Sequence, residues 1–179
     1  MNKFIILLRG INVGGKNKVP MKELTKHLLE AGLAGVKTYI QSGNLVISTS
    51  ITDRHEVTAL VMQVIEQRFG FQVSAIALTL NEYSRALTNN PFKDAEDTPS
   101  TLHLSFLDTI PSDPDIEKLD NLKSNSERFK LNGPMFYLHA PDGVGRSKLA
   151  AGAEKAIGVP ATARNWRSAQ KILELAEQD

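Results

Sequence analysis

The residues best suited to binding chemistry lie in a glycine-rich, basic loop near the start of the chain. Residues 9–18 read Arg-Gly-Ile-Asn-Val-Gly-Gly-Lys-Asn-Lys, and no acidic residue precedes Glu23. Glycines leave backbone N–H groups open, and cationic side chains beside such groups favour an anion. The ligand-binding residues that we expect in this loop are Arg9, Asn12, Gly14, Gly15, Lys16 and Lys18.

The same loop matches part of the phosphate-binding motif of nucleoside triphosphatases, from Gly10 to Gly15 and Lys16. Asn17 stands where that motif needs Ser or Thr for magnesium. The following helix is expected to open only at Pro20, so the loop does not sit on a helix N-terminus. We therefore do not expect a nucleoside triphosphatase.

A second glycine-rich stretch, residues 141–148, follows an expected strand and opens an expected helix. A helix N-terminus favours an anion, so we expect Arg146, Ser147 and Lys148 to contribute to binding. The alternative is a flexible connector with solvated basic side chains. Arg164 and Asn165 can also project into a site, or they flank the lone Trp166 as a core anchor.

The sequence does not allow catalytic residues to be assigned. Strand alternation would place His103, Ser105, Tyr137 and His139 on one sheet face, where a structural cluster is the simpler interpretation. Two histidines without carboxylates do not make a metal site, and none is expected. The chain has no cysteine, which excludes thiolate chemistry and suits a cytoplasmic protein. Whether the protein is an enzyme, and which cofactor it uses, stay undetermined.

Composition indicates a folded chain of one domain or two small ones, with 179 residues, 41% of them hydrophobic, and a net charge of +1. The apolar run at residues 4–8 is ended by Arg9 and Gly10, so we expect neither a signal peptide nor a membrane partner. Charge is unevenly distributed: residues 94–120 contain eight acidic residues and one base, Lys118, whereas residues 123–171 contain nine bases and three acidic residues. This asymmetry produces a local positive field, or it is an ordinary solvated surface.

The first half of the chain is expected to form a strand at residues 4–8, a helix at 20–31, strands at 36–40 and 45–48, a helix from Asp53 to about Phe69, and a strand at 72–78. This order is typical of the split βαβ, ferredoxin-like unit. In that topology the first loop and the turn at residues 41–44 lie at the same end of the sheet. Gln41, Ser42 and Asn44 would then add hydrogen bonds to the site, unless Gly43 and Asn44 only shape the turn.

The second half resembles a looser copy, with strands at residues 101–107, 127–131 and 135–139. Helices are expected from Thr79 to about Leu87, at 113–121, from about Arg146 to before Gly158, and from Thr162 or Ala163 onward. We therefore predict an α+β fold of two ferredoxin-like subdomains packed together, with mainly antiparallel sheets and a C-terminal helix. The expected boundaries are 1–78, containing the glycine and basic loop, and 79–179, containing the C-terminal helices.

Ferredoxin-like domains that bind RNA expose aromatic side chains on the first and third strands. Here those strands are apolar on both faces and carry one aromatic residue, Phe4. This pattern indicates a sheet covered on both sides rather than a stacking platform. Binding of nucleic-acid phosphates by the loops remains as an alternative.

Four stretches of the chain form a recognisable set: residues 7–17, 39–44, 145–148 and 161–166. Together they resemble the bacterial domain of unknown function 1697 family. The resemblance covers essentially the whole chain and implies a cytosolic α+β protein, without an activity or catalytic residues to transfer.

Three function classes follow. The first is binding of a phosphate-bearing or other anionic small molecule through the two glycine and basic loops. The second is a nucleic-acid-binding module that uses the same loops and the basic C-terminal third. The third is a protein-interaction or oligomeric module in which the acidic segment faces a partner or a second copy. The oligomeric state is not readable from the sequence.

Overall fold

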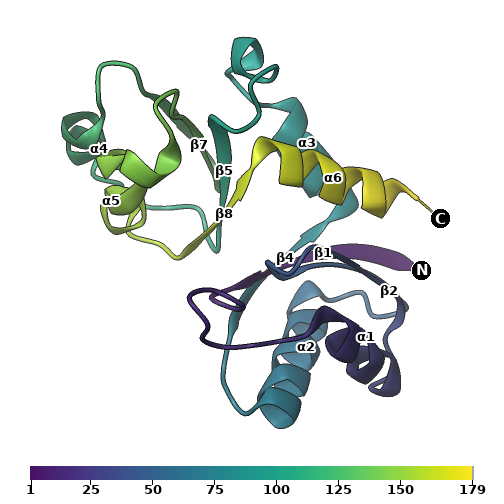
Figure 1. Ribbon diagram of the computed structural model, residues 1–179. Helices are drawn as coiled ribbons and strands as arrows, with labels where there is room; N and C mark the ends of the chain where they lie inside the picture. Colours follow the sequence, from purple (N-terminus) through teal and green to yellow (C-terminus); the bar gives the residue numbers. More distant parts are fainter. Residues whose placement is uncertain (179) are drawn as a thin grey trace. The chain divides into compact units, whose positions relative to one another are not determined.

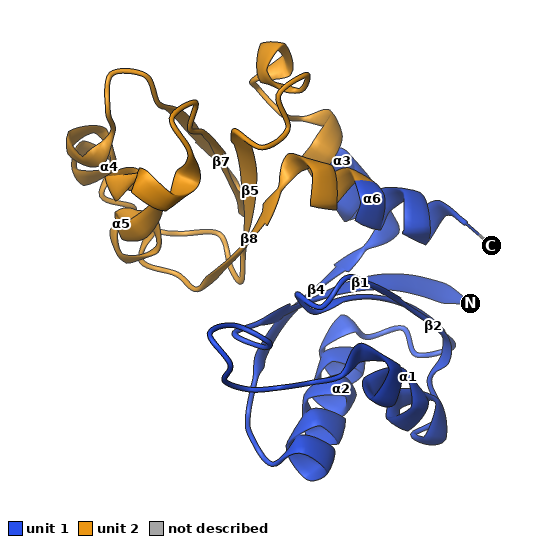
Figure 2. Cartoon of the chain, in the orientation of Figure 1, with its two compact units in different colours: residues 1–85, 171–179 blue, residues 86–170 orange. Residues whose placement is uncertain are grey.

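The computed structural model describes residues 1–178, which form two compact units (Figure 2). Unit 1 comprises Met1–Arg85 and the chain from Lys171 onward, and unit 2 comprises Ala86–Gln170. Each unit is built on its own four-stranded antiparallel sheet.

Unit 1 contains the strands β1 (Asn2–Arg9), β2 (Ala34–Tyr39), β3 (Asn44–Thr49) and β4 (Ser74–Thr79), in the order β2-β3-β1-β4. The helices α1 (Met21–Glu30) and α2 (Arg54–Phe69) connect them and cover one face of the sheet (Figure 1). Leu24 and Leu28 of α1 and Val61 of α2 join Ile6 and Leu8 of β1 in one buried core. This topology confirms the predicted ferredoxin-like unit.

The opposite face of β1 is buried as well, through Ile5 and Leu7. The chain's end returns to this sheet: Lys3 Nζ donates to the carbonyl of Ala176 at 2.6 Å, and Lys37 Nζ donates to that of Gln178 at 2.9 Å. Ammonium groups at the C-terminal end of a helix are favourable because the helix dipole is negative there. Among the described residues, β1 of the unit 1 sheet is therefore buried on both faces.

The helix ends follow the signals in the sequence. Asp53 caps α2 by accepting from the N–H of His55 at 2.8 Å, and Gly70 ends this helix at a φ of 79°. The helix α3 (Leu80–Thr88) opens with the expected capping box. Glu82 accepts from the N–H of Thr79 at 2.9 Å, and the N–H of Glu82 donates to the Thr79 hydroxyl at 3.2 Å.

Unit 2 repeats the strand order of unit 1. Its strands are β5 (Leu102–Leu107), β6 (Arg128–Asn132), β7 (Met135–His139) and β8 (Ala161–Asn165), in the order β6-β7-β5-β8. The helices α4 (Ile116–Leu122) and α5 (Lys148–Ile157) and the 3-10 turns η1 (Lys93–Ala95) and η2 (Val144–Arg146) connect them. The predicted architectural copy is thus complete.

The start of the last helix was predicted wrongly. Residues from Thr162 to Asn165 were expected to be helical, but they belong to β8 and pair with β5. The helix α6 (Trp166–Glu177) begins afterwards, where Asn165 Oδ1 accepts from the N–H of Ser168 at 2.8 Å. The open edge of β5 offers backbone hydrogen bonds to this segment, and that long-range pairing overrides its local helical pattern.

The predicted polar face in unit 2 was also wrong. Directly paired residues of antiparallel strands share a face, and His103 pairs with Leu138 whereas His139 pairs with Leu102. His103 and Ser105 therefore face one side of the sheet, and Tyr137 and His139 face the other. Alternation within each strand was read correctly, but the register between the strands separates the two histidines.

Candidate functional site

The first glycine loop closes on itself as a small hairpin. The N–H of Lys16 donates to the carbonyl of Val13 at 3.1 Å, and Gly14 and Gly15 both have positive φ, 59° and 76°. These are the features of a type I′ turn, which explains the two glycines without a ligand. Among residues 1–178 no acceptor engages the N–H groups of Gly14 and Gly15.

The structure brings the turn at residues 41–44 to the first loop, as the topology predicted. Asn12 Nδ2 donates to the carbonyl of Gln41 at 2.7 Å, and the N–H of Leu8 donates to that of Gly43 at 2.8 Å. The two segments therefore form one end of the unit 1 sheet.

Two of the predicted site residues, Asn12 and Asn44, use their side-chain amides to hydrogen-bond the backbone of this region. Asn12 Nδ2 also donates to the carbonyl of Val19 at 2.9 Å, and its Oδ1 accepts from the Val19 N–H at 2.8 Å. The buried Asn44 donates to the carbonyl of Tyr39 and to Ser42 Oγ, both at 3.0 Å. The predicted site residues with exposed side chains here are Arg9, Lys16, Lys18, Gln41 and Ser42.

The second glycine loop lies beside a pocket of about 350 Å³ in unit 2. The pocket is lined by residues of the α4–β6 connection and of the loop that leads into α5. They are Asn121, Leu122, Lys123, Ser124, Glu127, Asp142, Gly143, Arg146, Ser147 and Lys148. All three of the predicted residues in this loop, Arg146, Ser147 and Lys148, thus border a real cavity.

The acidic side chains of this pocket accept hydrogen bonds, whereas its basic side chains have no acidic partner among residues 1–178. Glu127 Oε2 accepts from the N–H of Ser124 at 2.9 Å, and Asp142 Oδ2 accepts from Ser126 Oγ at 2.6 Å. Within the described chain, no acidic group pairs with Lys123, Arg146 or Lys148. Three cations therefore stand free beside two carboxylates that already have hydrogen-bond donors.

Ser147 has a structural role in this pocket. Its hydroxyl accepts from the N–H of Ala150 at 2.8 Å and caps α5. An N-cap serine satisfies one of the open N–H groups of the first turn, and the others are available to a ligand or water.

Arg164 and Asn165 do not line this pocket. Asn165 caps α6, and Arg164 Nη1 donates to the carbonyl of Ala163 at 2.7 Å. Trp166 is buried, which favours its interpretation as a core anchor. Its indole N–H is the one buried side-chain polar atom without a partner in the described chain.

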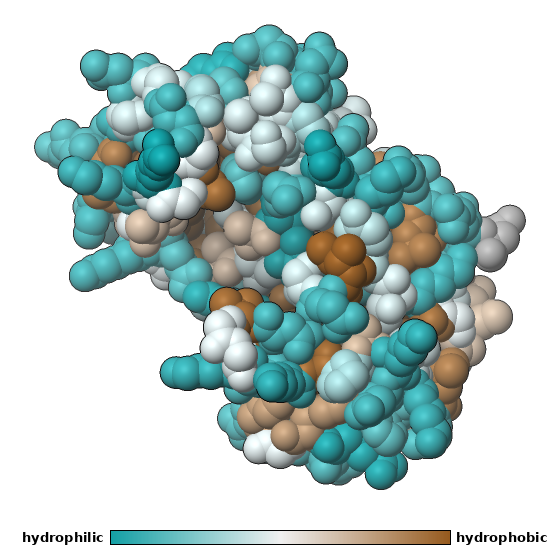
Figure 3. Space-filling view, in the orientation of Figure 1, coloured by the Kyte–Doolittle hydropathy of each residue, from teal (hydrophilic) through white to brown (hydrophobic). Residues whose placement is uncertain are grey.

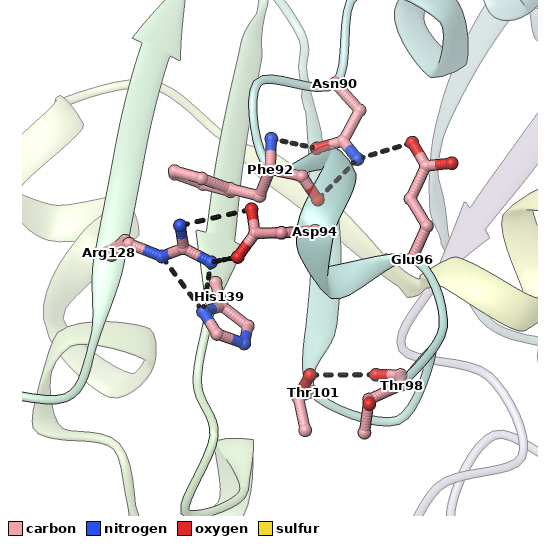
Figure 4. Close-up of polar contacts among 8 residues, drawn as sticks. All are labelled: Asn90, Phe92, Asp94, Glu96, Thr98, Thr101, Arg128 and His139. Atoms are coloured by element: carbon pink, nitrogen blue, oxygen red, sulfur yellow. Dashed lines mark hydrogen bonds and ion pairs between the residues drawn. The ribbon is translucent and has the colours of Figure 1, made fainter.

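A polar cluster that the sequence did not reveal lies on the other side of unit 2 (Figure 4). Arg128 donates to Asp94 Oδ1 and Oδ2 at 3.2 and 2.7 Å, and its Nε donates to His139 Nδ1 at 3.1 Å. The guanidinium carbon also lies 4.8 Å from the ring centre of Phe92. Arg128 and His139 are directly paired in the β6–β7 hairpin, so the hairpin register was the signal that could have found them.

This cluster disfavours protonation of His139. Burial and the adjacent Arg128 guanidinium lower the pKa of His139 from its usual 6.5, and Asp94 opposes the shift. The Arg128 side chain likewise lowers the pKa of Asp94. His139 is thus a hydrogen-bond acceptor that anchors Arg128, and through it the η1 segment.

We expect the protein to lose stability as the pH falls below 6.5. Below this pH, His139 binds a proton more readily in the unfolded chain than in the folded chain. A lower pH therefore favours unfolding. His103 contributes in the same direction, because burial lowers its pKa too. A His139→Gln variant, which keeps an acceptor for Arg128, is expected to show a shallower acid-side loss. Urea unfolding at several pH values measures this, and equal slopes for both proteins would contradict the assignment.

Among the described residues, no group of three or more His, Cys, Asp or Glu side chains could hold a metal ion. The helices formed by residues 1–178 also include none that is long and apolar enough to cross a membrane.

Comparison with known protein families shows to which family this chain belongs. The model of the family described as "Protein of unknown function (DUF1697)" matches residues 1–137. The chain belongs to the DUF1697 family. The matched range contains the first glycine loop and the turn at 41–44, and it ends before the second glycine loop.

A solved structure shares the fold of this DUF1697 chain over almost its whole length. It is the conserved bacterial protein SP0830 from Streptococcus pneumoniae, with 25% identity and a TM-score of 0.72. The alignment covers 98% of this chain and 99% of the Streptococcus protein. No curated protein matches the chain.

Proposed function

We propose that this DUF1697 protein binds a small anionic molecule, such as a phosphate ester, in the unit 2 pocket beside the second glycine loop. The observation that carries the proposal is the set of three cations, Lys123, Arg146 and Lys148, which line one cavity without an acidic partner in the described residues.

The backbone supports the same charge preference. The pocket borders the N-terminus of α5, where the helix dipole and the N–H groups not used by Ser147 favour negative charge. The neutral side chains of Asn121 and Ser124 lie in the same lining and can orient a bound group. The bonded carboxylates of Glu127 and Asp142 limit the excess positive charge, which favours a compact anion over a polyanion.

The first loop is the less favoured binding site. Its glycines are explained by a hairpin turn, and Asn12 and Asn44 are committed to backbone groups. Arg9, Lys16 and Lys18 remain as an exposed basic surface in unit 1.

The test is a thermal-shift and calorimetric titration with inorganic phosphate, pyrophosphate, sugar phosphates and nucleotides. A ligand at 100 times its dissociation constant stabilises by about 2.7 kcal/mol, which raises the melting midpoint by roughly 5–10 °C. An Arg146→Ala, Lys148→Ala variant is expected to lower the affinity by at least about tenfold, since each charged hydrogen bond contributes roughly 1.5 kcal/mol or more.

The matched control is Lys130→Ala, Arg167→Ala, which removes the same charge from exposed positions that do not line the pocket. Equal loss of affinity in both variants would show general electrostatics rather than this pocket. Binding confined to RNA or DNA oligomers, with affinity falling by about 10³-fold or more between 50 and 200 mM salt, would favour the nucleic-acid alternative instead.

A further inference from the structure

Two surface regions of this chain are complementary in charge, and each carries exposed aliphatic side chains. The basic tip consists of Arg9, Val13, Lys16, Lys18 and Ile40, at one end of the unit 1 sheet. The acidic ledge consists of Asp108, Ile110, Asp113, Ile116 and Glu117, in the segment of unit 2 that runs from the end of β5 into α4.

The aliphatic side chains of the basic tip and the acidic ledge are unusually exposed to solvent. Figure 3 shows a face that is mainly hydrophilic, with hydrophobic residues in small separate groups. Val13 and Ile110 are each 68% exposed, Ile40 is 50% exposed and Ile116 is 43% exposed. The other large hydrophobic side chains that are exposed among the described residues are Met1, Leu29 and Val144.

Backbone conformation in the tip adds a second observation. Among residues 1–178, the residues other than glycine with positive φ are Asn12, Asn17 and Ile40, and all of them lie in the first loop or the adjoining turn. A β-branched residue rarely adopts a φ of 49°, which Ile40 has, because its side chain crowds the backbone. The turn thus exposes an aliphatic side chain at a sparsely populated φ, and residues in such conformations cluster at functional sites.

Two cations of the tip and three carboxylates of the ledge are available. Within the described chain, Lys16 and Lys18 have no ion-pair partner, and neither have Asp108, Asp113 and Glu117. The residues of the first loop include no acid, and the ledge includes no base before Lys118. A shallow hollow of about 420 Å³, lined by Asp115, Glu117, Lys118, Asn121 and Leu122, lies next to Ile116.

We propose that the basic tip of one copy docks on the acidic ledge of a second copy. Lys16 and Lys18 then meet the ledge carboxylates, and Val13 and Ile40 cover the ledge isoleucines. The contact joins two different surfaces, so it closes into a dimer when two such contacts form reciprocally, and otherwise it extends into a chain of copies. The second copy is favoured as occupant because this sequence itself carries a region of the complementary charge and the same aliphatic character.

Sedimentation equilibrium of the full chain tests this proposal. Association is expected at low salt, and its dissociation constant is expected to rise at least about tenfold between 50 and 500 mM salt, because exposed charges are screened. The tip variant Lys16→Glu, Lys18→Glu and the ledge variant Asp108→Lys, Asp113→Lys are each expected to weaken self-association by at least about tenfold. Mixing the two variants is expected to restore association, since each reversed surface then finds an opposite one.

The control is Lys130→Glu, Lys155→Glu, which changes the net charge as the tip variant does but alters exposed positions in neither region. Circular dichroism confirms that every variant is folded. A monomeric wild-type chain at all salt concentrations would overturn the proposal, and so would mixed variants that do not associate. A monomer whose tip binds oligonucleotides, with loss in the tip variant alone, would assign the tip to nucleic acid.

Discussion

A Gly43→Ala substitution is expected to destabilise the protein by about 2–4 kcal/mol, through a steric clash and a strained backbone together. A Cβ at this position would lie 2.7 Å from Leu8 Cβ and 2.9 Å from Ile11 Cδ1, which are both in the core. The φ of Gly43 is 80°, a conformation that side-chain-bearing residues avoid. For a chain of this size the melting midpoint should fall by roughly 5–15 °C, measured by calorimetry.

Gly14→Ala is the matched control for this prediction. Gly14 also has a positive φ, 59°, but a Cβ there would meet nothing within 4 Å. It is therefore expected to cost only the backbone strain, about 1–2 kcal/mol. If both variants lost the same stability, the close packing of Gly43 against β1 and the first loop would not be the cause.

A Tyr137→Phe variant is expected to change how stability responds to alkaline pH. The buried Tyr137 hydroxyl donates to the carbonyl of Ala86 at 2.8 Å, and burial raises its pKa from 10.0 to about 12. Between these values the unfolded chain releases the proton and the folded chain keeps it, so the wild type loses stability as the pH rises. The full loss from this group is about 2–3 kcal/mol.

Phenylalanine cannot ionise, so the variant should lack this part of the alkaline loss. At neutral pH it should instead be less stable than the wild type by about 1–2 kcal/mol, because the Ala86 carbonyl loses its donor. Urea unfolding at neutral pH and at about pH 11 should therefore show the difference between the two proteins shrinking or reversing. A difference that stayed constant with pH would contradict a neutral, buried Tyr137 hydroxyl.

Local sequence signals predicted most of the elements because their causes are local. Asp53 and Gly70 bound α2, and Thr79 with Glu82 opens α3, through hydrogen bonds between neighbours in the sequence. The strand and helix order of the first half was enough to place the turn at residues 41–44 beside the first loop, because few topologies are compatible with that order. The contact of Asn12 with Gln41 confirms that placement.

The errors arose where pairing between distant segments decides the outcome. The segment that forms β8 has a helix-compatible pattern, yet it completes the sheet of unit 2 along β5. The separation of His103 from His139 depends on strand register, which alternation within one strand does not reveal. The cluster of Asp94, Arg128 and His139 joins three segments that carry no common motif.

By itself, the sequence determined the α+β class, the first ferredoxin-like unit, the family resemblance and the two glycine loops, because turns, caps and hydrophobic periodicity act over a few residues. Tertiary structure alone decided what those loops are. It made the first a hairpin held by Asn12, and it placed the second beside Lys123 and Ser124 to form a pocket. Side-chain hydrogen bonds and cavities depend on which distant segments meet, and that is set by packing of the whole unit rather than by any local pattern.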